Sequence, residues 1–214
     1  MLPEPQLPDP LPAEPMALLA EWLAQALRRR DQPNPDAMVL ATASNGQPSA
    51  RVVLCKQIEP DSGTIRFYTN YDSRKGRELA ANPRAALVFH WDHLNRQARL
   101  EGQVEQGSAA DSDAYFSSRP RESQIGAHAS RQSQPIASLA ELGQQVEAAR
   151  QRFGSGPVPR PPHWGGFIFR AEAVELWTGG AARLHERARW TRELSVSCSS
   201  RPVAGPWNVS RLQP

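Results

Sequence analysis

Cysteine and lysine are the residue types that this chain of 214 residues uses least. Cys55 and Cys198 belong to no CxxC or Cys/His pattern, so the sequence predicts neither a metal site nor a disulfide framework. Its hydrophobic runs fall short of the roughly 20 residues of a membrane helix, and no glycine-rich phosphate loop follows a strand pattern. We therefore expect no membrane partner, and neither a Rossmann nor a P-loop nucleotide site.

The N-terminus lacks the positive charge and apolar stretch of a secretory signal. Its first 15 residues, MLPEPQLPDPLPAEP, are acidic and rich in proline, which is typical of extended coil. Together with the low cysteine content, this composition indicates the reducing cytoplasm. It also suggests that the chain divides into a proline-rich extension, residues 1–15, and one domain, residues 16–214.

Lysine is rare although the chain carries 25 basic residues and a net charge of +3. An arginine-rich composition accounts for the arginines without any function. Lys56 and Lys75 stand out, because a compact ammonium is not equivalent to a guanidinium. The arginines are scattered, and the tryptophans do not alternate with cations as they do on a stacking surface for nucleic acid. No nucleic-acid partner is expected.

Hydrophobic periodicity predicts helices and strands in an antiparallel order. The predicted helices cover residues 16–30, 74–82, 108–118 and 138–153. The predicted strands cover residues 37–44, 50–58, 64–69, 85–91, 97–106, 165–171, 173–179 and 182–190, with a last strand near the C-terminus. Asn45-Gly46 indicates a hairpin, whereas residues 119–138 and 193–205 read as irregular loops. This order is typical of an α+β fold built on an antiparallel β-barrel with flanking helices.

Arg74 and Lys75 stand where the third predicted strand gives way to a helix. Cations oppose the helix dipole at that end, whereas the backbone N–H groups there favour an anion. The pattern is compatible both with a phosphate site and with a solvated basic face. Arg51 and Lys56 lie five positions apart in the predicted strand 50–58, an odd offset that places them on opposite faces.

Two later segments carry polar side chains that suit a ligand. Residues 122–134 combine small, hydroxyl and amide side chains, which suit either close contact with a ligand or an ordinary surface loop. Arg183, His185 and Arg187 are spaced by two and so share one face of a predicted strand. No protein nucleophile is indicated, and Cys55 reads as a buried packing residue. Such residues suit an enzyme whose cofactor carries the chemistry.

Seven stretches, in chain order, resemble the pyridoxine/pyridoxamine 5′-phosphate oxidase family: RVVLCK, FYTNYDSRKGRE, FHWDHLNRQARLEG, YFSSRPRESQIGAHASRQSQ, PPHWGGF, RLHER and the terminal RLQP. The resemblance covers residues 35–214 and implies an FMN-binding split barrel of the α+β class, a homodimer and FMN at the interface between its subunits. The implied reaction oxidises pyridoxine or pyridoxamine 5′-phosphate to pyridoxal 5′-phosphate. A hydride passes from the substrate C4′ carbon to the flavin, and O2 reoxidises the flavin with release of H2O2.

The same resemblance implies the site residues. Those implied for FMN are Arg51, Val52, Val53, Leu54, Cys55, Lys56, Tyr68, Thr69, Arg74, Lys75, Gln97, Gln132, Ser133, Trp177 and Arg187, with Arg74 and Lys75 on the phosphate. Those implied for the substrate phosphate are Lys56, Tyr115, Arg119 and Ser123. Arg183 and His185 are implied as the catalytic pair that holds the pyridine ring over the flavin.

The chain departs from the family pattern in four places, one of which is the segment 193–205, for which the family has no counterpart. His128 stands where tryptophan is usual, and Cys55 where leucine is usual. The first 15 residues lack the basic and tyrosine residues of the family's N-terminal segment, which closes over the substrate. A lid from that end is therefore not predicted.

Two other flavin proteins of the same fold stay open as alternatives. One is a phenazine-biosynthesis oxidase, whose substrate carries no phosphate, and the other is a non-catalytic FMN-binding protein. Tyr115, Arg119 and Ser123 favour a phosphorylated substrate, while Arg183 and His185 favour catalysis. The sequence does not indicate which B6 vitamer is preferred.

Overall fold

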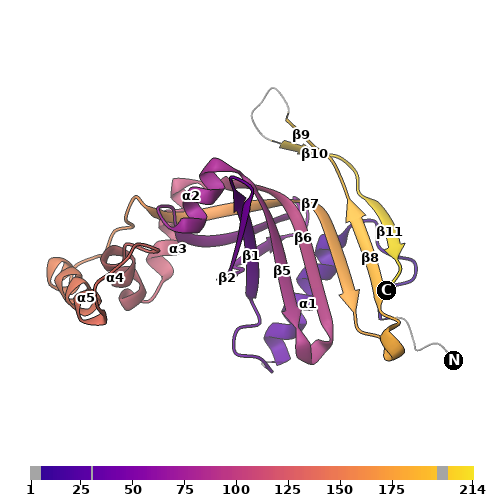
Figure 1. The fold of residues 1–214 in the computed structure, drawn as a ribbon, viewed down its shortest axis with the longest axis horizontal. Helices are drawn as coiled ribbons and strands as arrows, with labels where there is room; N and C mark the ends of the chain where they lie inside the picture. The colour runs from indigo at the N-terminus through magenta and orange to yellow at the C-terminus, as the bar shows by residue number, and fades with distance from the viewer. Residues whose placement is uncertain (1–5, 30, 197–201) are drawn as a thin grey trace.

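The computed structural model describes residues 6–29, 31–196 and 202–214, whose arrangement Figure 1 shows. The helices are α1 (Pro15–Arg29), α2 (Arg74–Ala81), α3 (Ala109–Ser118), α4 (Arg121–Ala129) and α5 (Leu139–Phe153), with 3-10 turns η1 (Asp92–Leu94) and η2 (Ala181–Arg183). The strands are β1 (Ala37–Ser44), β2 (Gln47–Leu54), β3 (Gln57–Glu59), β4 (Thr64–Asn70), β5 (Arg84–Trp91), β6 (Arg96–Gln106), β7 (Trp164–Thr178), β8 (Glu186–Thr191), β9 (Leu194–Val196), β10 (Pro202–Ala204) and β11 (Asn208–Leu212). Cys198 lies outside the described residues.

The long strand β7 organises the sheet. It has 15 residues, and β6 pairs with it along most of its length. Its other edge is shared, because β4 pairs with residues 164–170 and β8 with residues 173–178. The sheet continues from β6 through β5 and β1 to β2, and β2 contacts β4, which closes a barrel. β8 and β11 leave this barrel beside the end of β7, so the barrel is split, as predicted.

Aromatic side chains of the strands fill the barrel, and α1 packs against them. Phe67, Phe89 and Phe169 are fully buried. Trp22 of α1 meets Trp91 of β5 edge-on, with ring centroids 6.4 Å apart. The buried residues of α1 recur at helical spacing, so its apolar face accounts for this contact.

A second, smaller cluster joins α3, α4 and α5 to the first residue of β7. Phe116, Ile125, Ala149 and Trp164 are buried in it. Figure 1 shows α4 and α5 at the opposite end of the molecule from β8 and β11. The helical cluster and the barrel therefore meet where β7 begins.

The prediction of one strand over residues 50–58 is wrong, because the chain changes partners there. β2 ends at Leu54, and the Cys55 N–H then donates to the Asp36 carbonyl at 2.8 Å. The Lys56 N–H donates to the Arg66 carbonyl of β4 at 2.9 Å. Lys56 therefore lies between two strands, and its offset from Arg51 does not define opposite faces of one strand.

Three further boundaries differ from the predictions. Residues 119–138 are predicted as an irregular loop but contain α4. The sequence of α4 is mostly polar, and its buried residues Ile125 and Ala129 lie four positions apart on one helix face. The strands predicted at 165–171 and 173–179 are one strand, β7, because β6 pairs across the junction through a bulge. Residues 193–205 contain the paired strands β9 and β10, with residues 197–201 outside the described part. Among the residues that the structure describes, no helix is long and apolar enough to span a membrane.

Gly102 permits the closest backbone approach in the barrel wall. The register between β6 and β7 shifts at this residue, and a Cβ there would lie 2.0 Å from the Arg170 carbonyl oxygen. We expect Gly102→Ala to lower the free energy of unfolding by about 2 kcal/mol, measured by chemical denaturation. Gly143→Ala is the control, since it lies in an exposed stretch of α5 where a Cβ meets nothing within 4 Å. It should raise that free energy by about 0.5–1 kcal/mol, and equal effects would contradict the argument.

Candidate active site

The first turn of α2 holds Lys75 among hydroxyl and amide groups. Ser73 is the N-cap of this helix. Lys75 Nζ donates to Thr69 Oγ1 and Ser73 Oγ, both at 3.1 Å, and to Gln132 Oε1 at 2.7 Å. These partners are neutral, and burial together with the charge of Arg51 lowers the pKa of Lys75 to about 8. The site thus holds a cation in surroundings that favour the arrival of an anion.

A buried carboxylate, Glu78, connects the neighbouring arginines. Its Oε2 accepts from Arg51 Nη2 at 2.9 Å, and its Oε1 accepts from Arg74 Nε at 2.8 Å. Burial raises the pKa of Glu78, but the hydrogen bonds from Thr42, Arg74 and Arg51 outweigh it and lower the pKa to about 2. Glu78 is not among the residues predicted from the sequence, although its position four residues after Arg74 is a signal for such a pair.

The charges of this cluster match a phosphate monoester. Arg51, Arg74 and Lys75 are positive and Glu78 is negative, so the cluster carries two net positive charges. A phosphate monoester carries about two negative charges at neutral pH, and the N-terminus of α2 adds its own N–H groups. The residues present therefore fit the phosphate of FMN.

A second group of predicted residues lies on β4 and α3. Tyr68 stacks on Tyr115 with ring centroids 3.9 Å apart and on Trp164 at 5.6 Å. The guanidinium carbon of Arg119 lies 4.5 Å from the centre of the Trp164 ring. Arg119 Nη1 is buried and has no hydrogen-bond partner among the described residues. A buried donor in this condition is costly unless an acceptor binds there, which makes Arg119 a candidate for a second anion site.

Two other residues are predicted for the substrate phosphate. Lys56 pairs with Arg66 of β4 through its backbone N–H, and Ser123 lies in α4, the helix that follows α3. Lys56 Nζ forms an ion pair with Asp36 at 2.8 Å. The N–H of Ser123, in the first turn of α4, donates to the Pro120 carbonyl at 2.9 Å. Lys56 is thus already engaged by a carboxylate, which a phosphate would have to displace or share.

A third group lies on β6, β7 and β8. Gln97, Trp177 and Arg187 are paired in register across these three strands. The His185 ring packs against Trp177 with centroids 4.7 Å apart. Arg187 donates to Glu175 Oε1 from Nε at 3.1 Å and from Nη2 at 2.9 Å. Four residues predicted from distant parts of the sequence therefore adjoin one another.

Arg183 lies in the turn η2 and not on a strand face, contrary to the prediction for residues 182–190. Ala182 and Arg183 have φ values of 52° and 63°, in the left-handed region that is costly for residues other than glycine. The Gly180 N–H donates to His185 Nδ1 at 3.2 Å, which ties the turn to the residue before β8. The Arg183 side chain is exposed. Left-handed backbone at a residue predicted to contact substrate is typical of a functional turn.

The predicted site residues fall into two separate groups in one chain, which we call candidate half-sites. The phosphate half-site comprises Arg51, Thr69, Arg74, Lys75 and Gln132, and the ring half-site comprises Gln97, Trp177, Arg183, His185 and Arg187. Thr69 pairs with Gly165 near the start of β7, whereas Trp177 lies near its end. At a rise of about 3.3 Å per residue, the strand separates the two by roughly 40 Å. Figure 1 shows the same separation, since α2 and β8 lie on opposite sides of the strands β1, β5 and β6.

The residues in and just after strand β2 that are predicted to contact FMN differ in exposure. Val52 and Leu54 are 63% and 39% exposed, whereas Val53 and Cys55 are buried in the core. Val53 and Cys55 can therefore meet a cofactor only through their backbone groups. Burial raises the pKa of Cys55 to about 12, so its thiol stays protonated and packs as an apolar group.

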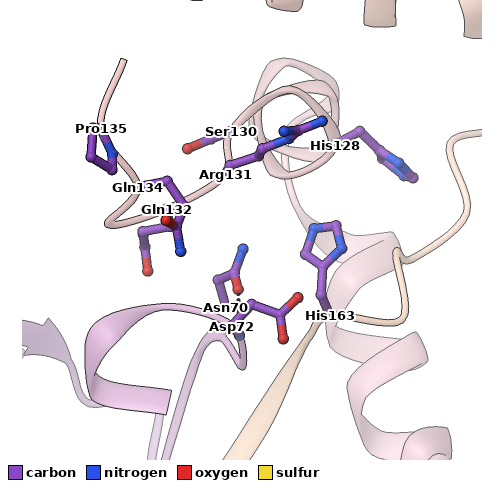
Figure 2. Close-up of a pocket in the computed structure, with 9 residues that line it drawn as sticks. All are labelled: Asn70, Asp72, His128, Ser130, Arg131, Gln132, Gln134, Pro135 and His163. Atoms are coloured by element: carbon purple, nitrogen blue, oxygen red, sulfur yellow. Dashed lines mark hydrogen bonds between the residues drawn. The ribbon is translucent and has the colours of Figure 1, made fainter. Parts of the chain in front are cut away.

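A cavity of about 610 Å³ adjoins the phosphate half-site (Figure 2). Figure 2 shows Asn70, Asp72 and His163 on one side and, on the other, Ser130, Arg131, Gln132, Gln134 and Pro135. Gln132 lines this cavity and also accepts from Lys75. The predicted residue Ser133 has a φ of 70° in the same loop. The cavity is also lined by Asn70, Asp72 and His163, which are not among the predicted site residues. They lie within the stretches that carry the family resemblance.

Family models match most of this chain. Residues 24–153 match the model for pyridoxamine 5′-phosphate oxidase, and residues 164–214 match the model for the C-terminal dimerisation region of pyridoxine 5′-phosphate oxidase. A pyridoxine/pyridoxamine 5′-phosphate oxidase of Gluconobacter oxydans (strain 621H) is 47% identical over 206 residues, which cover 95% of this chain and 96% of the relative. One from Bordetella petrii is 49% identical over 209 residues, which cover 97% and 93%.

Solved structures share the architecture. PhzG from Burkholderia lata 383, in complex with tetrahydrophenazine-1-carboxylic acid, has a TM-score of 0.86 and 29% identity, covering 99% of this chain and 98% of its own. A pyridoxamine 5′-phosphate oxidase-related FMN-binding protein from Nostoc punctiforme PCC 73102 has a TM-score of 0.70, covering 94% and 97%. Its 16% identity supports the fold alone. The family models and the curated relatives together show that the chain belongs to the pyridoxine/pyridoxamine 5′-phosphate oxidase family of FMN-dependent enzymes.

Proposed function

We propose that this chain oxidises pyridoxine or pyridoxamine 5′-phosphate to pyridoxal 5′-phosphate at a site built from both half-sites. The observation that carries the substrate class is the buried, unpartnered Nη1 of Arg119 within the described residues, which suits a phosphorylated substrate. Tyr115, Lys56 and Ser123 would complete the site for this phosphate. When bound, FMN supplies the acceptor for the two electrons that the substrate carbon loses, and O2 regenerates it with release of H2O2.

The chain's own residues bind and orient the reactants. Arg74 and Lys75 would hold the cofactor phosphate, while Arg119 would hold the substrate phosphate at a separate place. Arg183 and His185 would press the pyridine ring against the flavin, so that the reacting carbon lies at near-attack distance. The protein need not supply an indispensable base for this reaction.

The separation of the half-sites supports a homodimer with FMN at its interface. A small cofactor cannot span the roughly 40 Å that β7 places between them. A two-fold dimer solves this, because the phosphate half-site of one subunit can face the ring half-site of the other. The matched dimerisation region, residues 164–214, contains β7, β8 and β11.

Hybrid dimers test this arrangement directly. Lys75→Ala and Arg183→Ala each damage one half-site, so each homodimer should be nearly inactive at limiting FMN. After subunit exchange, each mixed dimer has one doubly damaged site and one intact site. A statistical mixture should therefore recover about a quarter of wild-type activity. Peroxide release measures the recovery, and a mixture no more active than its parents would show that both residues serve the same subunit's site.

A substrate panel tests the activity itself. Purified protein loaded with FMN should release peroxide with pyridoxine 5′-phosphate or pyridoxamine 5′-phosphate, and much more slowly with the vitamers that lack phosphate. Arg119→Ala should raise KM for the phosphorylated forms and change turnover of the others little. Failure to oxidise both phosphates would refute the proposal.

A phenazine-type oxidation is the second candidate, and the likeness to PhzG favours keeping it in the panel. A dihydrophenazine precursor therefore belongs beside the B6 vitamers. The phosphate-binding set around Arg119 and the nearly 50% identity to the B6 oxidase of Bordetella petrii favour the first candidate. Faster turnover of the phenazine precursor would reverse this order.

Two smaller proposals accompany the activity. A cytoplasmic location is supported by the low cysteine content and the buried thiol of Cys55. The boundary between an extension, residues 1–15, and a single domain, residues 16–214, is supported by the start of α1 at Pro15, whereas the described part of the extension packs on that domain through Leu7, which is buried in the main core.

A further inference from the structure

The described part of the proline-rich N-terminal arm, residues 6–14, packs against the C-terminal strands. It contains no helix or strand, yet Leu7 is only 1% exposed and belongs to the main core. Leu11 packs against the same core. The apolar side chains between the prolines therefore anchor an otherwise extended segment.

Backbone hydrogen bonds attach the same arm to β8 and β11. Both oxygens of the Glu186 carboxylate accept from the arm, at 2.8 Å from the Gln6 N–H and at 3.0 Å from the Leu7 N–H. The Pro12 carbonyl accepts from Trp190 Nε1 at 2.8 Å. The Pro8 carbonyl accepts from Arg211 of β11 at 3.0 Å. The arm thus meets β8 at both of its ends.

Glu186 occupies the position where the ring half-site joins β8. It is the first residue of that strand and stands between His185 and Arg187. Side chains alternate along a strand, so Glu186 shares a face with Trp190, and Arg187 points to the other face. The arm therefore lies behind the strand, on the face opposite Arg187.

We propose that residues 6–12 form a strap that positions Arg183 and His185 through Glu186, which is a positioning residue for the oxidation. Only Leu184 and His185 separate the left-handed turn at Ala182 and Arg183 from β8, and so the positions of Arg183 and His185 depend on where β8 begins. The Gln6 and Leu7 N–H groups hold the first residue of β8, Glu186, from the face opposite Arg187. This inference rests on the proposed function, since it assigns Arg183 and His185 to the substrate.

The test compares Glu186→Ala with Glu186→Gln, which keeps a neutral acceptor. Glu186→Ala should lower kcat/KM for the phosphorylated vitamer by about tenfold or more. FMN affinity should change far less, since the phosphate half-site lies at the other end of β7. Glu186→Gln should recover part of the loss and also tests the contact if the alanine protein does not fold. Wild-type kcat/KM in both variants would overturn the proposal, as would an equal loss of FMN affinity.

Two shortened chains provide the matched control. A chain in which a single Met replaces residues 1–5 keeps the Gln6 amide N–H and the other arm contacts named above, and should leave kcat/KM unchanged. Removal of residues 1–8 deletes both donors to Glu186 and should reproduce the defect of Glu186→Ala. Equal activity of the two shortened chains would also overturn the proposal.

A readout without substrate separates this proposal from the activity. Amide hydrogen exchange over residues 181–187 should speed up in Glu186→Ala and in the chain without residues 1–8. If wild-type protein oxidises no vitamer but this exchange changes, the proposed function fails while the strap contact stands. Unchanged exchange would refute the strap even in an active enzyme.

Discussion

Arg183→Ala should lower kcat for the phosphorylated vitamer by about 100-fold or more while FMN stays bound. Arg183 is exposed and lies on a turn, so its removal costs little packing. Alanine already occupies the left-handed backbone conformation at the preceding position, and so the turn can accept it. The loss should therefore come from the contact with the substrate ring. Single-turnover reduction of the bound flavin measures this step.

Arg189→Ala is the matched control for that variant. Arg189 lies on β8 and pairs at 3.2 Å with Glu101, a half-exposed partner outside both half-sites. Its loss should change kcat by about twofold at most, because exposed ion pairs contribute little. FMN content, from absorbance, should match wild type in both variants. Equal loss of FMN and of turnover in Arg183→Ala would show that the division between the half-sites is wrong.

Lys75→Ala should weaken FMN binding by about 100-fold, because it removes a charge-assisted contact to a dianion at a partly buried site. The effect should be far smaller for riboflavin, which lacks the phosphate. Arg77→Ala is the control, since Arg77 lies in the same helix and donates to the Asp72 carbonyl. Flavin fluorescence quenching measures each affinity. A similar loss for FMN and riboflavin would place the phosphate elsewhere.

The same lysine should make FMN binding depend on pH. Its pKa in the ligand-free protein is about 8, so below that pH the ammonium is charged and ready to bind the phosphate. Above it, binding must first take up a proton, and the affinity should fall by up to about tenfold per pH unit. Arg51 and Glu78 face this ammonium, and the lowered pKa of Glu78 keeps its carboxylate charged over this range. Lys75→Arg should abolish the dependence, and an unchanged pH profile in that variant would contradict it.

Local chemistry in the sequence predicts several parts of the site well. Asn45 and Gly46 specify the turn between β1 and β2, where both adopt positive φ. Ser73 caps α2, so Arg74 and Lys75 lie at the helix start that their spacing predicts. Such features depend on a few adjacent residues, which is why they can be read from a short stretch.

Other parts could not be predicted, because they depend on contacts between distant segments. Lys56 leaves the strand since its backbone turns from β1 to β4. α4 is polar along most of its length, and only its packing on α5 explains it. Glu78 becomes the link between Arg51 and Arg74 only once α2 packs on β1 and the Arg51 side chain reaches across from β2.

The sequence by itself determined the family and most of the order of the elements, and it predicts which residues would surround the flavin, since these follow from motifs and from local periodicity. Tertiary structure alone decided where those residues lie. The register of β4, β6 and β8 on β7 divides them between the two ends of one strand. Burial in the core likewise decided that Leu7 ties the proline-rich arm to β8. Pairing and burial are properties of the whole chain, and no short stretch of it encodes them.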